Sequence, residues 1–391
     1  MTRRVAFIVS HPVQYYTPLY QRLACREDLQ IKIFFTWHAG STPVEDRGFG
    51  IPVFWDIPLT AGYDFELVEN EAADPGTHHF FGLRNSSLVK RVTTWRPDIV
   101  IVHGWAWQSH LHALWTFQRI NLPTLFRGDS NLLNVVRSGL SWWVKQRVLS
   151  RIFSWPVGFL VVGSANLDYY RAFGVNADRL FYCPHSIDVN RFANPAEQME
   201  QEAAGWRHAL GINNRATVLL YAGKFEPVKR PLELMKAVLQ INQSDLILVL
   251  VGGGELQSDV NAIAQANEKS FRVLPFQNQS KMPLVYRLGD LTVLPSAHET
   301  WGLAVNEALA SGRPVLISDR VGCAPDVVDG SCGSVFSWDT PFSLLHTLAK
   351  LVSEPGRLTE MRQAAGTRAR NFDIGRTEEG LMRALKAVHL Q

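Results

Sequence analysis

The sequence predicts an α/β protein made of two doubly wound domains. Three observations predict it: short apolar runs alternate with helical stretches, a polar segment rich in Glu and Gln at 193–211 interrupts this alternation, and a second alternating set follows. Strands that alternate with helices form parallel sheets covered by helices on both faces. With 391 residues the chain is long enough for two ordinary domains.

The elements can be assigned in order from these runs. In the first half, the predicted strands are Val5–Ser10, Ile31–Thr36, Ile99–His103, Thr124–Phe126 and Phe159–Val162, and the predicted helices include Pro18–Cys25, Gln108–Gln118 and Gly139–Phe153. Segment 41–90 is irregular and rich in Gly, Pro and aromatic residues, so we expect an insertion or a long loop there. In the second half, the predicted strands are Thr217–Gly223, Leu246–Gly252, Phe271–Leu274, Leu291–Leu294 and Val315–Ser318.

Composition narrows the class of protein. Hydrophobic residues make up 46% and charged residues 19%, which is typical of a globular enzyme. A formal net charge of +3 gives no reason to expect a nucleic-acid partner. The four cysteines show no metal-binding spacing and are expected to be reduced thiols, so we expect a cytoplasmic protein. No secretory signal and no apolar run long enough to span a membrane is recognised.

The most informative stretch is 293–318, VLPSAHETWGLAVNEALASGRPVLIS. It predicts a strand, a loop, a helix and a second strand, with Glu299 in the loop and Glu307 inside the helix. Gly302 lies near the helix start, where the free N–H groups of Leu303 and Ala304 and the helix dipole favour an anion. We therefore expect these backbone groups to face phosphates while Glu299 faces ligand hydroxyls.

Two further loops follow predicted strands of the second half. The strand at 217–223 leads into GKFEPVKRP, in which Lys224 and Lys229 can both turn toward one anion. Taken alone, the two lysines would be interpreted as surface residues. The presence of Glu299 and Glu307 downstream favours the interpretation that the lysines bind phosphate. The strand at 246–252 leads into the glycines around Gly253, which permit a tight turn and close approach of the backbone to a ligand.

Together these motifs resemble the retaining glycosyltransferases of the family 4 type, which have a GT-B fold and a Glu-x7-Glu signature. The resemblance implies that Glu299 binds the hydroxyls of the donor sugar, Glu307 binds the nucleotide ribose, and Lys224 and Lys229 neutralise the donor diphosphate. Lys224 stands where the family usually has arginine. The resemblance also implies that the backbone of VLPFQ at 273–277, with Pro275 and Phe276, holds the base.

The GT-B resemblance also predicts the domain organisation. We expect a Rossmann-like acceptor domain at 1–195, a linker with a short helix at 196–215 and a Rossmann-like donor domain at 216–375, the two domains facing a central cleft. A C-terminal helix at 376–391 is expected to pack back toward the first domain.

The loops of the expected first domain match the family's sequence pattern less closely than the loops of the second domain do. SHPVQYY after the first strand places His11 and Gln14 at the expected cleft, and His11 is either a ligand contact or a capping residue. The strand ending at His103 is followed by Trp105 and Trp107. Tryptophans there can stack on a sugar or pack in the core; we expect one of each, and the sequence does not distinguish them.

TLFRGDSN stands where many family members have a histidine that contacts the sugar across the cleft. Here Arg127 and Asp129 occupy the loop. Arg127 is a candidate for a catalytic role at the phosphates or at an anionic acceptor, and Asp129 for an acceptor hydroxyl. The alternative is a buried Arg–Asp pair without a ligand role.

Two other segments, at 183–192 and 139–153, have recognisable patterns. CPHSIDVNRF resembles the turn that closes the first domain, in which Asp188 and Phe192 are expected to be structural. Helix 139–153 is basic and carries Trp142 and Trp143, so it is either a peripheral membrane contact at the inner membrane surface or an ordinary covering helix.

From this we expect a retaining glycosyltransferase, a hexosyltransferase by class, that moves a sugar from a nucleotide-sugar donor to a glycan, lipid-linked sugar or small-molecule acceptor. No Asp-x-Asp motif is seen in the cleft loops, so we expect no metal and no other cofactor. The alternatives are another GT-B enzyme, such as a nucleotide-sugar epimerase, and a non-catalytic protein that binds nucleotide sugars.

Overall fold

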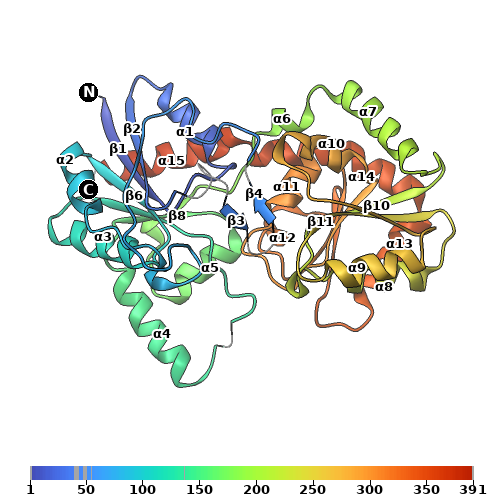
Figure 1. The fold of residues 1–391 in the computed structure, drawn as a ribbon. Coiled ribbons are helices and arrows are strands. Elements are labelled where there is room, and N and C mark those ends of the chain that lie inside the picture. The colour runs from blue at the N-terminus through green and yellow to red at the C-terminus, as the bar shows by residue number, and fades with distance from the viewer. Residues whose placement is uncertain (1, 39–43, 47–50, 54, 136, 390–391) are drawn as a thin grey trace. The chain divides into compact units, whose positions relative to one another are not determined.

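The computed structural model describes residues 2–38, 44–46, 51–53, 55–135 and 137–389. The chain divides into two compact units (Figure 1). Unit 1 comprises Met1–Val44, Ile57–His185 and Ile374–Gln391, and unit 2 comprises Glu45–Asp56 and Ser186–Asp373. Segment 45–56, expected in the first domain, therefore groups with the second unit.

Unit 1 is built on a parallel sheet with the strand order β5-β2-β1-β6-β7-β8-β9. Its strands are β1 (Arg3–Val9), β2 (Leu29–Phe35), β5 (Phe65–Leu67), β6 (Ile99–His103), β7 (Thr124–Arg127), β8 (Gly158–Val161) and β9 (Leu180–Tyr182). The chain winds outward from β1 through β2 and then returns to β6 on the other side of β1. The order of the strands thus reverses between β1 and β6.

Helices cover both faces of this sheet. They are α1 (Thr17–Ala24), α2 (Leu88–Trp95), α3 (Gln108–Arg119), α4 (Gly139–Ile152), α5 (Ser164–Ala172) and α15 (Ile374–His389), with short 3₁₀ turns η1 (Phe80–Gly82) and η2 (Ala177–Arg179). Residues of β1 alternate between two apolar clusters, Ala6 and Ile8 in one and Val5 and Phe7 in the other. The C-terminal helix α15 packs against α1 in the second of these clusters, although the two lie at opposite ends of the chain (Figure 1).

Unit 2 contains a second parallel sheet with the order β12-β11-β10-β13-β14-β15. Its strands are β10 (Thr217–Lys224), β11 (Leu246–Gly253), β12 (Phe271–Leu274), β13 (Leu291–Leu294), β14 (Val315–Ser318) and β15 (Gly333–Phe336). The order reverses between β10 and β13. A separate pair, β3 (Val44–Asp46) and β4 (Ile51–Val53), lies in the segment that joins this unit from the first half of the chain.

The helices of unit 2 include one that was expected to be mainly a linker. They are α6 (Val189–Ala193), α7 (Ala196–Ala209), α8 (Pro231–Ile241), α9 (Gln257–Ala266), α10 (Met282–Arg287), α11 (Leu303–Ala310), α12 (Ala324–Val327), α13 (Ser343–Ser353) and α14 (Pro355–Ala369), with 3₁₀ turns η3 (Pro227–Lys229), η4 (Gln279–Lys281) and η5 (Arg370–Phe372). Helix α7 fills most of 196–215 and packs on α10. No helix in the described part of the chain is long and apolar enough to cross a membrane.

The apolar runs predicted the central strands closely, because parallel strands covered on both faces are continuously hydrophobic. Three short edge or outer strands, β5, β9 and β15, were not predicted. Each is only three or four residues long, and β5 and β9 are incompletely buried. Segment 41–90, expected to be irregular, contributes β5 to the first sheet; its residues 41–43, 47–50 and 54 lie outside the described residues.

Candidate functional site

Both sheets have a point at which the strand order reverses, and ligands of open α/β sheets bind beyond the carboxyl ends of the strands at such points. In unit 2 the reversal lies between β10 and β13, which are followed by Lys229 and Glu299 respectively. In unit 1 it lies between β1 and β6, which are followed by His11 and Gly104. The topology therefore places one candidate site in each unit.

The charged centre of the unit 2 site is the contact of Lys229 with Glu299. Lys229 Nζ lies 2.7 Å from Glu299 Oε1, and Ser296 Oγ donates to the same oxygen at 2.9 Å. The backbone joins the two loops as well, because Ala297 N donates to Val228 O at 2.7 Å. Lys224 ends β10, next to Gly253 at the end of β11. The sequence-predicted Lys and Glu residues thus share one edge of the sheet.

Helix α11 begins at the same edge. Gly302 adopts φ +96°, a left-handed conformation that favours glycine, and a Cβ there would lie 2.6 Å from Val321 Cγ1. Gly302 is the N-cap residue, and it has no side chain that could cap the helix start. The first N–H groups, those of Leu303 and Ala304, precede the first intrahelical bond from Val305 N to Gly302 O. The helix start therefore offers backbone donors and the positive end of the dipole to an anion.

Glu307, one turn into α11, is held by a residue that the sequence did not suggest. Tyr286 of α10 is buried, and its Oη donates to Glu307 Oε2 at 2.6 Å. Desolvation raises the pKa of Glu307 above its ordinary value, while the Tyr286 hydrogen bond and the attraction of Arg191 oppose that rise. One carboxylate oxygen is thereby fixed, which orients the group for a hydroxyl ligand.

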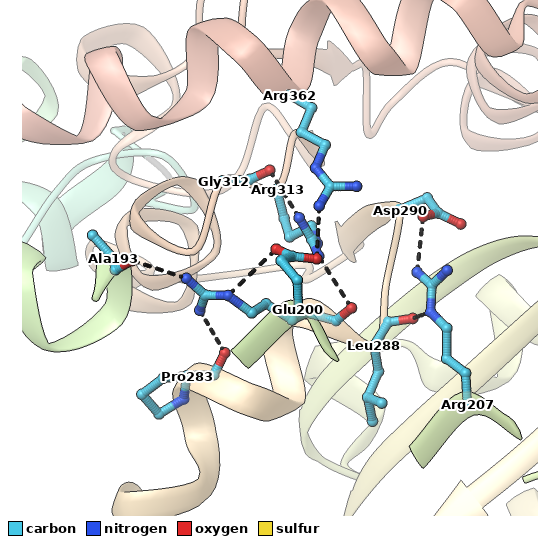
Figure 2. Close-up of polar contacts among 10 residues, drawn as sticks. Ala193, Glu200, Arg207, Pro283, Leu288, Asp290, Gly312, Arg313 and Arg362 are labelled. Carbon is cyan, nitrogen blue, oxygen red and sulfur yellow. Dashed lines mark hydrogen bonds and ion pairs between the residues drawn. The ribbon is translucent and has the colours of Figure 1, made fainter. Parts of the chain in front are cut away.

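A cluster of arginines around Glu200 lies at the carboxyl ends of α10 and α11 (Figure 2). Arg313, 1% exposed, pairs with Glu200 at 2.6 Å and donates to the carbonyl of Arg287, the last residue of α10. Arg362 lies 2.7 Å from Glu200, and Arg287 Nε lies 3.4 Å from it. Arg313 directly follows the turn that ends α11. The cluster therefore braces the carboxyl ends of the two helices that carry Tyr286 and Glu307.

The loops that follow β11 and β12 lie at the same edge of the sheet as Lys229 and Glu299. Gly252 lies so close to β10 that a Cβ would be 1.9 Å from Gly223 O, which explains the glycine there. Beyond β12, Pro275 is exposed and Phe276 is half-buried. The structure thus brings the predicted donor residues of unit 2 to the carboxyl ends of adjacent strands.

The unit 1 site is a cavity of about 270 Å³ at the carboxyl ends of β1, β6 and β7. His11, His103, Arg127 and Asp129, all predicted site residues, line it. Gln14 and Trp105, also predicted, lie outside the lining. The remaining described residues of the lining are Val9, Ser10, Val13, Tyr15, Tyr16, Thr77, Gly104, Trp107 and Gly128.

The ambiguity between the two tryptophans is resolved by their packing. Trp105 packs against the apolar cluster beneath α3 and α5. Trp107 lines the cavity, and its Nε1 donates to Thr77 O at 3.1 Å. Both follow the same strand, and the turn that separates them from it contains Gly104, with φ +78°.

Arg127 is largely engaged by the protein itself. Its Nη1 donates to Cys183 O at 2.9 Å, and its Nη2 and Nε lie 3.4 Å from Pro184 O and Tyr16 Oη. The side chain is 3% exposed. These bonds connect β7 to the chain after β9, so Arg127 has a structural role in addition to its place in the cavity wall.

Burial lowers the pKa of several histidines of this unit, which favours their neutral form. Burial lowers the pKa of His103 well below its ordinary value, and the positive charge of Arg127 lowers it further. Burial also lowers the pKa of His11 to about 4 and that of His110 to about 4. A neutral imidazole both accepts and donates a hydrogen bond. The cavity can therefore bind hydroxyl groups through uncharged partners.

One group of side chains among the described residues could hold a metal ion. Asp74, His78 and His79 have ligand atoms within 4.8 Å of one another. They are wholly or partly exposed and lie in unit 1, on the loop that precedes η1. They do not belong to the Lys–Glu site of unit 2.

Comparison with known proteins shows which family the second half of the chain is similar to. Residues 203–372 match the model of the family described as glycosyl transferases group 1. A D-inositol 3-phosphate glycosyltransferase of Salinispora arenicola is 31% identical over 209 residues, 50% of this chain and 47% of that protein. One from Mycobacterium sp. (strain JLS) is 34% identical over 207 residues, 50% of this chain and 45% of that protein. The chain thus spans about half the length of the curated relatives it matches.

Solved structures resemble the whole chain in fold. Anabaena Alr3699/HepE, solved in complex with UDP, has a TM-score of 0.74 at 16% identity, covering 99% of this chain and 100% of that one. Sucrose-phosphate synthase from Thermosynechococcus elongatus has a TM-score of 0.71 at 17% identity, covering 99% and 100%. The fold is therefore GT-B, and residues 203–372, which carry the Lys–Glu site, match the model of the group 1 glycosyl transferases.

Proposed function

We propose that the protein is a retaining glycosyltransferase that uses a nucleotide-sugar donor. The observation that carries the proposal is the convergence of Lys229, Glu299 and the uncapped start of α11 at the strand reversal of unit 2. The family match of residues 203–372 and the UDP bound by the structurally similar HepE support it. The acceptor would bind in the cavity of unit 1.

In this proposal each charged group acts on the donor. Lys224, Lys229 and the backbone N–H groups of Leu303 and Ala304 stabilise the negative charge that grows on the leaving diphosphate. Glu299 binds the hydroxyls of the sugar and keeps Lys229 oriented, and Glu307 binds the ribose. The acceptor hydroxyl attacks the anomeric carbon on the face from which the diphosphate leaves, and a phosphate oxygen takes its proton.

No metal is assigned to the donor site in this scheme, because two lysines and a helix start supply the counter-charge. We expect turnover to persist in excess EDTA. Activity lost in EDTA and restored by magnesium or manganese would contradict metal independence without contradicting the glycosyltransferase assignment.

The proposal is tested by a thermal-shift screen of UDP-, ADP- and GDP-sugars, followed by product analysis. A ligand that binds only the folded state raises its stability by about 2.7 kcal/mol at 100 times Kd. We expect at least one donor to raise Tm and to yield a glycoside whose anomeric configuration is retained. Release of free nucleoside diphosphate with an epimerised sugar would indicate an epimerase, and no shift with any donor would contradict the proposal.

We also propose that α4 brings unit 1 to an anionic membrane surface. Its exposed apolar side chains, Leu140, Trp143, Val144 and Val148, share the helix with Lys145, Arg147 and Arg151 and with no acidic residue. An amphipathic basic helix of this kind binds anionic lipid. The cytoplasmic location expected from the cysteines would make this surface the inner membrane surface. Co-sedimentation of the protein with phosphatidylglycerol vesicles should be weakened by Trp143→Ala and by high salt. If as much protein sedimented with neutral vesicles as with phosphatidylglycerol vesicles, the proposed binding to anionic lipid would be contradicted.

A further inference from the structure

A segment from the first half of the chain, 45–56, belongs to unit 2 and ends at the loop that follows β12. Asp56 makes the attachment. Its Oδ1 accepts from Ser280 N at 3.0 Å, its Oδ2 accepts from Ser280 Oγ, and its own N donates to Asn278 Oδ1 at 3.3 Å. Three polar contacts therefore hold Asp56 at the start of η4 and α10.

This attachment places Trp55 beside Phe276. The ring centroids lie 6.4 Å apart at an interplanar angle of 62°, an edge-on arrangement. Both side chains are only half-buried, so part of each ring stays accessible. Aromatic rings in the interior would be expected to bury most of their surface.

The position of this pair along the sheet suggests its ligand. Strand β12 is two places from β10 in the sheet, which is about 10 Å at the usual strand spacing. The strand between them, β11, ends in Gly252, Gly253 and Gly254. The diphosphate would lie at Lys224 and Lys229. The nucleoside attached to it can therefore cross the end of β11, where the three glycines have no side chains, and bring its base to the two aromatic rings.

We propose that Trp55, together with Phe276, forms the subsite for the donor's nucleobase, and that Asp56 is the residue that positions Trp55. The inference rests on the proposed function, because the diphosphate site sets the starting point of the nucleoside. Base–aromatic contacts contribute through the faces and edges of both rings and tolerate different bases. The base subsite is thus completed by a segment remote in sequence from the rest of the donor site.

The test uses the full-length protein, and calorimetry with UDP, ADP and GDP first identifies the nucleoside diphosphate that binds wild type most tightly. Pyrophosphate and ribose 5-phosphate serve as base-free probes. Trp55→Ala should weaken the chosen nucleoside diphosphate about tenfold, within the range reported for loss of one base–aromatic contact. Trp55→Phe should recover most of that loss, and binding of the base-free probes should not change.

Trp115→Ala, which removes an exposed indole from α3 of unit 1, is the matched control and should leave all affinities unchanged. Asp56→Asn should weaken the nucleoside diphosphate a few-fold, again without affecting pyrophosphate. Melting curves confirm that each variant is folded. Equal loss for pyrophosphate and nucleoside diphosphate, or no loss in Trp55→Ala, would overturn the inference; wild type that binds none of the three nucleotides would instead overturn the proposed function.

Discussion

The two units use polar side chains in opposite ways. In unit 2 the candidate donor site holds opposite charges at partly exposed loop ends, with Lys229 and Glu299 side chains 24% and 16% exposed. In unit 1 the polar groups around the cavity include, besides Arg127 and Asp129, buried histidines whose pKa values are lowered by burial, as for His103 and His185. A leaving diphosphate needs fixed charge, whereas hydroxyl groups can be bound by neutral partners.

The difference determines which measurements are informative for each unit. Deleting a charge should affect catalysis in unit 2, because the charge acts on a ligand and not on the core. Changing the pH should affect the stability of unit 1, because protonation would place a charge in its interior. Four predictions follow from this contrast, in order of decreasing size.

The largest effect is expected for Lys229→Ala. The leaving diphosphate would lose one stabilising charge, and removal of one such group costs on the order of 10²–10³ in kcat. Lys229→Arg should retain much more activity, and the Tm of both should stay near that of wild type. Lys269→Ala, at an exposed lysine of unit 2, is the control. Wild-type turnover in Lys229→Ala would make Lys229 a surface residue.

Glu307→Ala should weaken nucleoside diphosphate binding. The ribose would lose a charged acceptor, and hydrogen bonds to charged groups contribute about 1.5–3 kcal/mol, or roughly 10- to 150-fold in Kd. Calorimetry with the 2′,3′-dideoxy nucleotide should show almost no difference between variant and wild type, because that ligand lacks the hydroxyls. Glu268→Ala, at an exposed glutamate, should bind as wild type does. An equal loss for both ligands would assign Glu307 to structure instead of ribose binding.

Acid should destabilise unit 1 selectively. Burial lowers the pKa of His110 to about 4, and an unfolded histidine has a pKa of about 6.5, so the unfolded state binds more protons between these values. Stability is complete above about pH 6.5 and falls as the pH decreases toward 4, by about 2 kcal/mol at pH 5 from this residue alone. Hydrogen exchange at pH 7 and pH 5, corrected for the intrinsic rate, reports on each unit separately.

The described part of unit 2 has no buried histidine, so its protection should change less. His110 should also show no titration of its ring protons near pH 6 by NMR. Equal loss of protection in both units, or titration of His110 at its ordinary value, would show that the contrast between the units is wrong.

The smallest effect is expected for Tyr286→Phe. The variant keeps the packing of α10 but removes one hydrogen bond to Glu307, which is 2.6 Å long. A net contribution of about 0.5–1.5 kcal/mol corresponds to roughly 2- to 10-fold weaker nucleotide binding. Because the bond also lowers the pKa of Glu307, the variant should lose affinity at a higher pH than wild type does. An unchanged pH profile would mean that Tyr286 does not position the carboxylate.

The central strands and the position of Lys229 and Glu299 at one edge of the unit 2 sheet were predictable from the sequence, because their signals are local. The strands at 271–274, 291–294 and 315–318 were predicted to the residue, since each is a continuous apolar run in a sheet covered on both faces. Glu299 and Lys229 follow neighbouring strands, so parallel pairing alone brings them to one edge. Helix α7 was not recognised in full because its sequence is polar, with a single buried residue.

What the sequence by itself determined is therefore the α/β class, the two sheets and the loops that follow β10, β11 and β13, because apolar periodicity and loop spacing are properties of short segments. Tertiary structure alone decided that Tyr286 holds Glu307, that Trp107 and not Trp105 lines the cavity, and that Trp55 and Asp56 join unit 2. These contacts link residues that are distant in sequence or depend on the direction of one side chain. Such contacts form only when packing brings the segments together, so no local pattern encodes them.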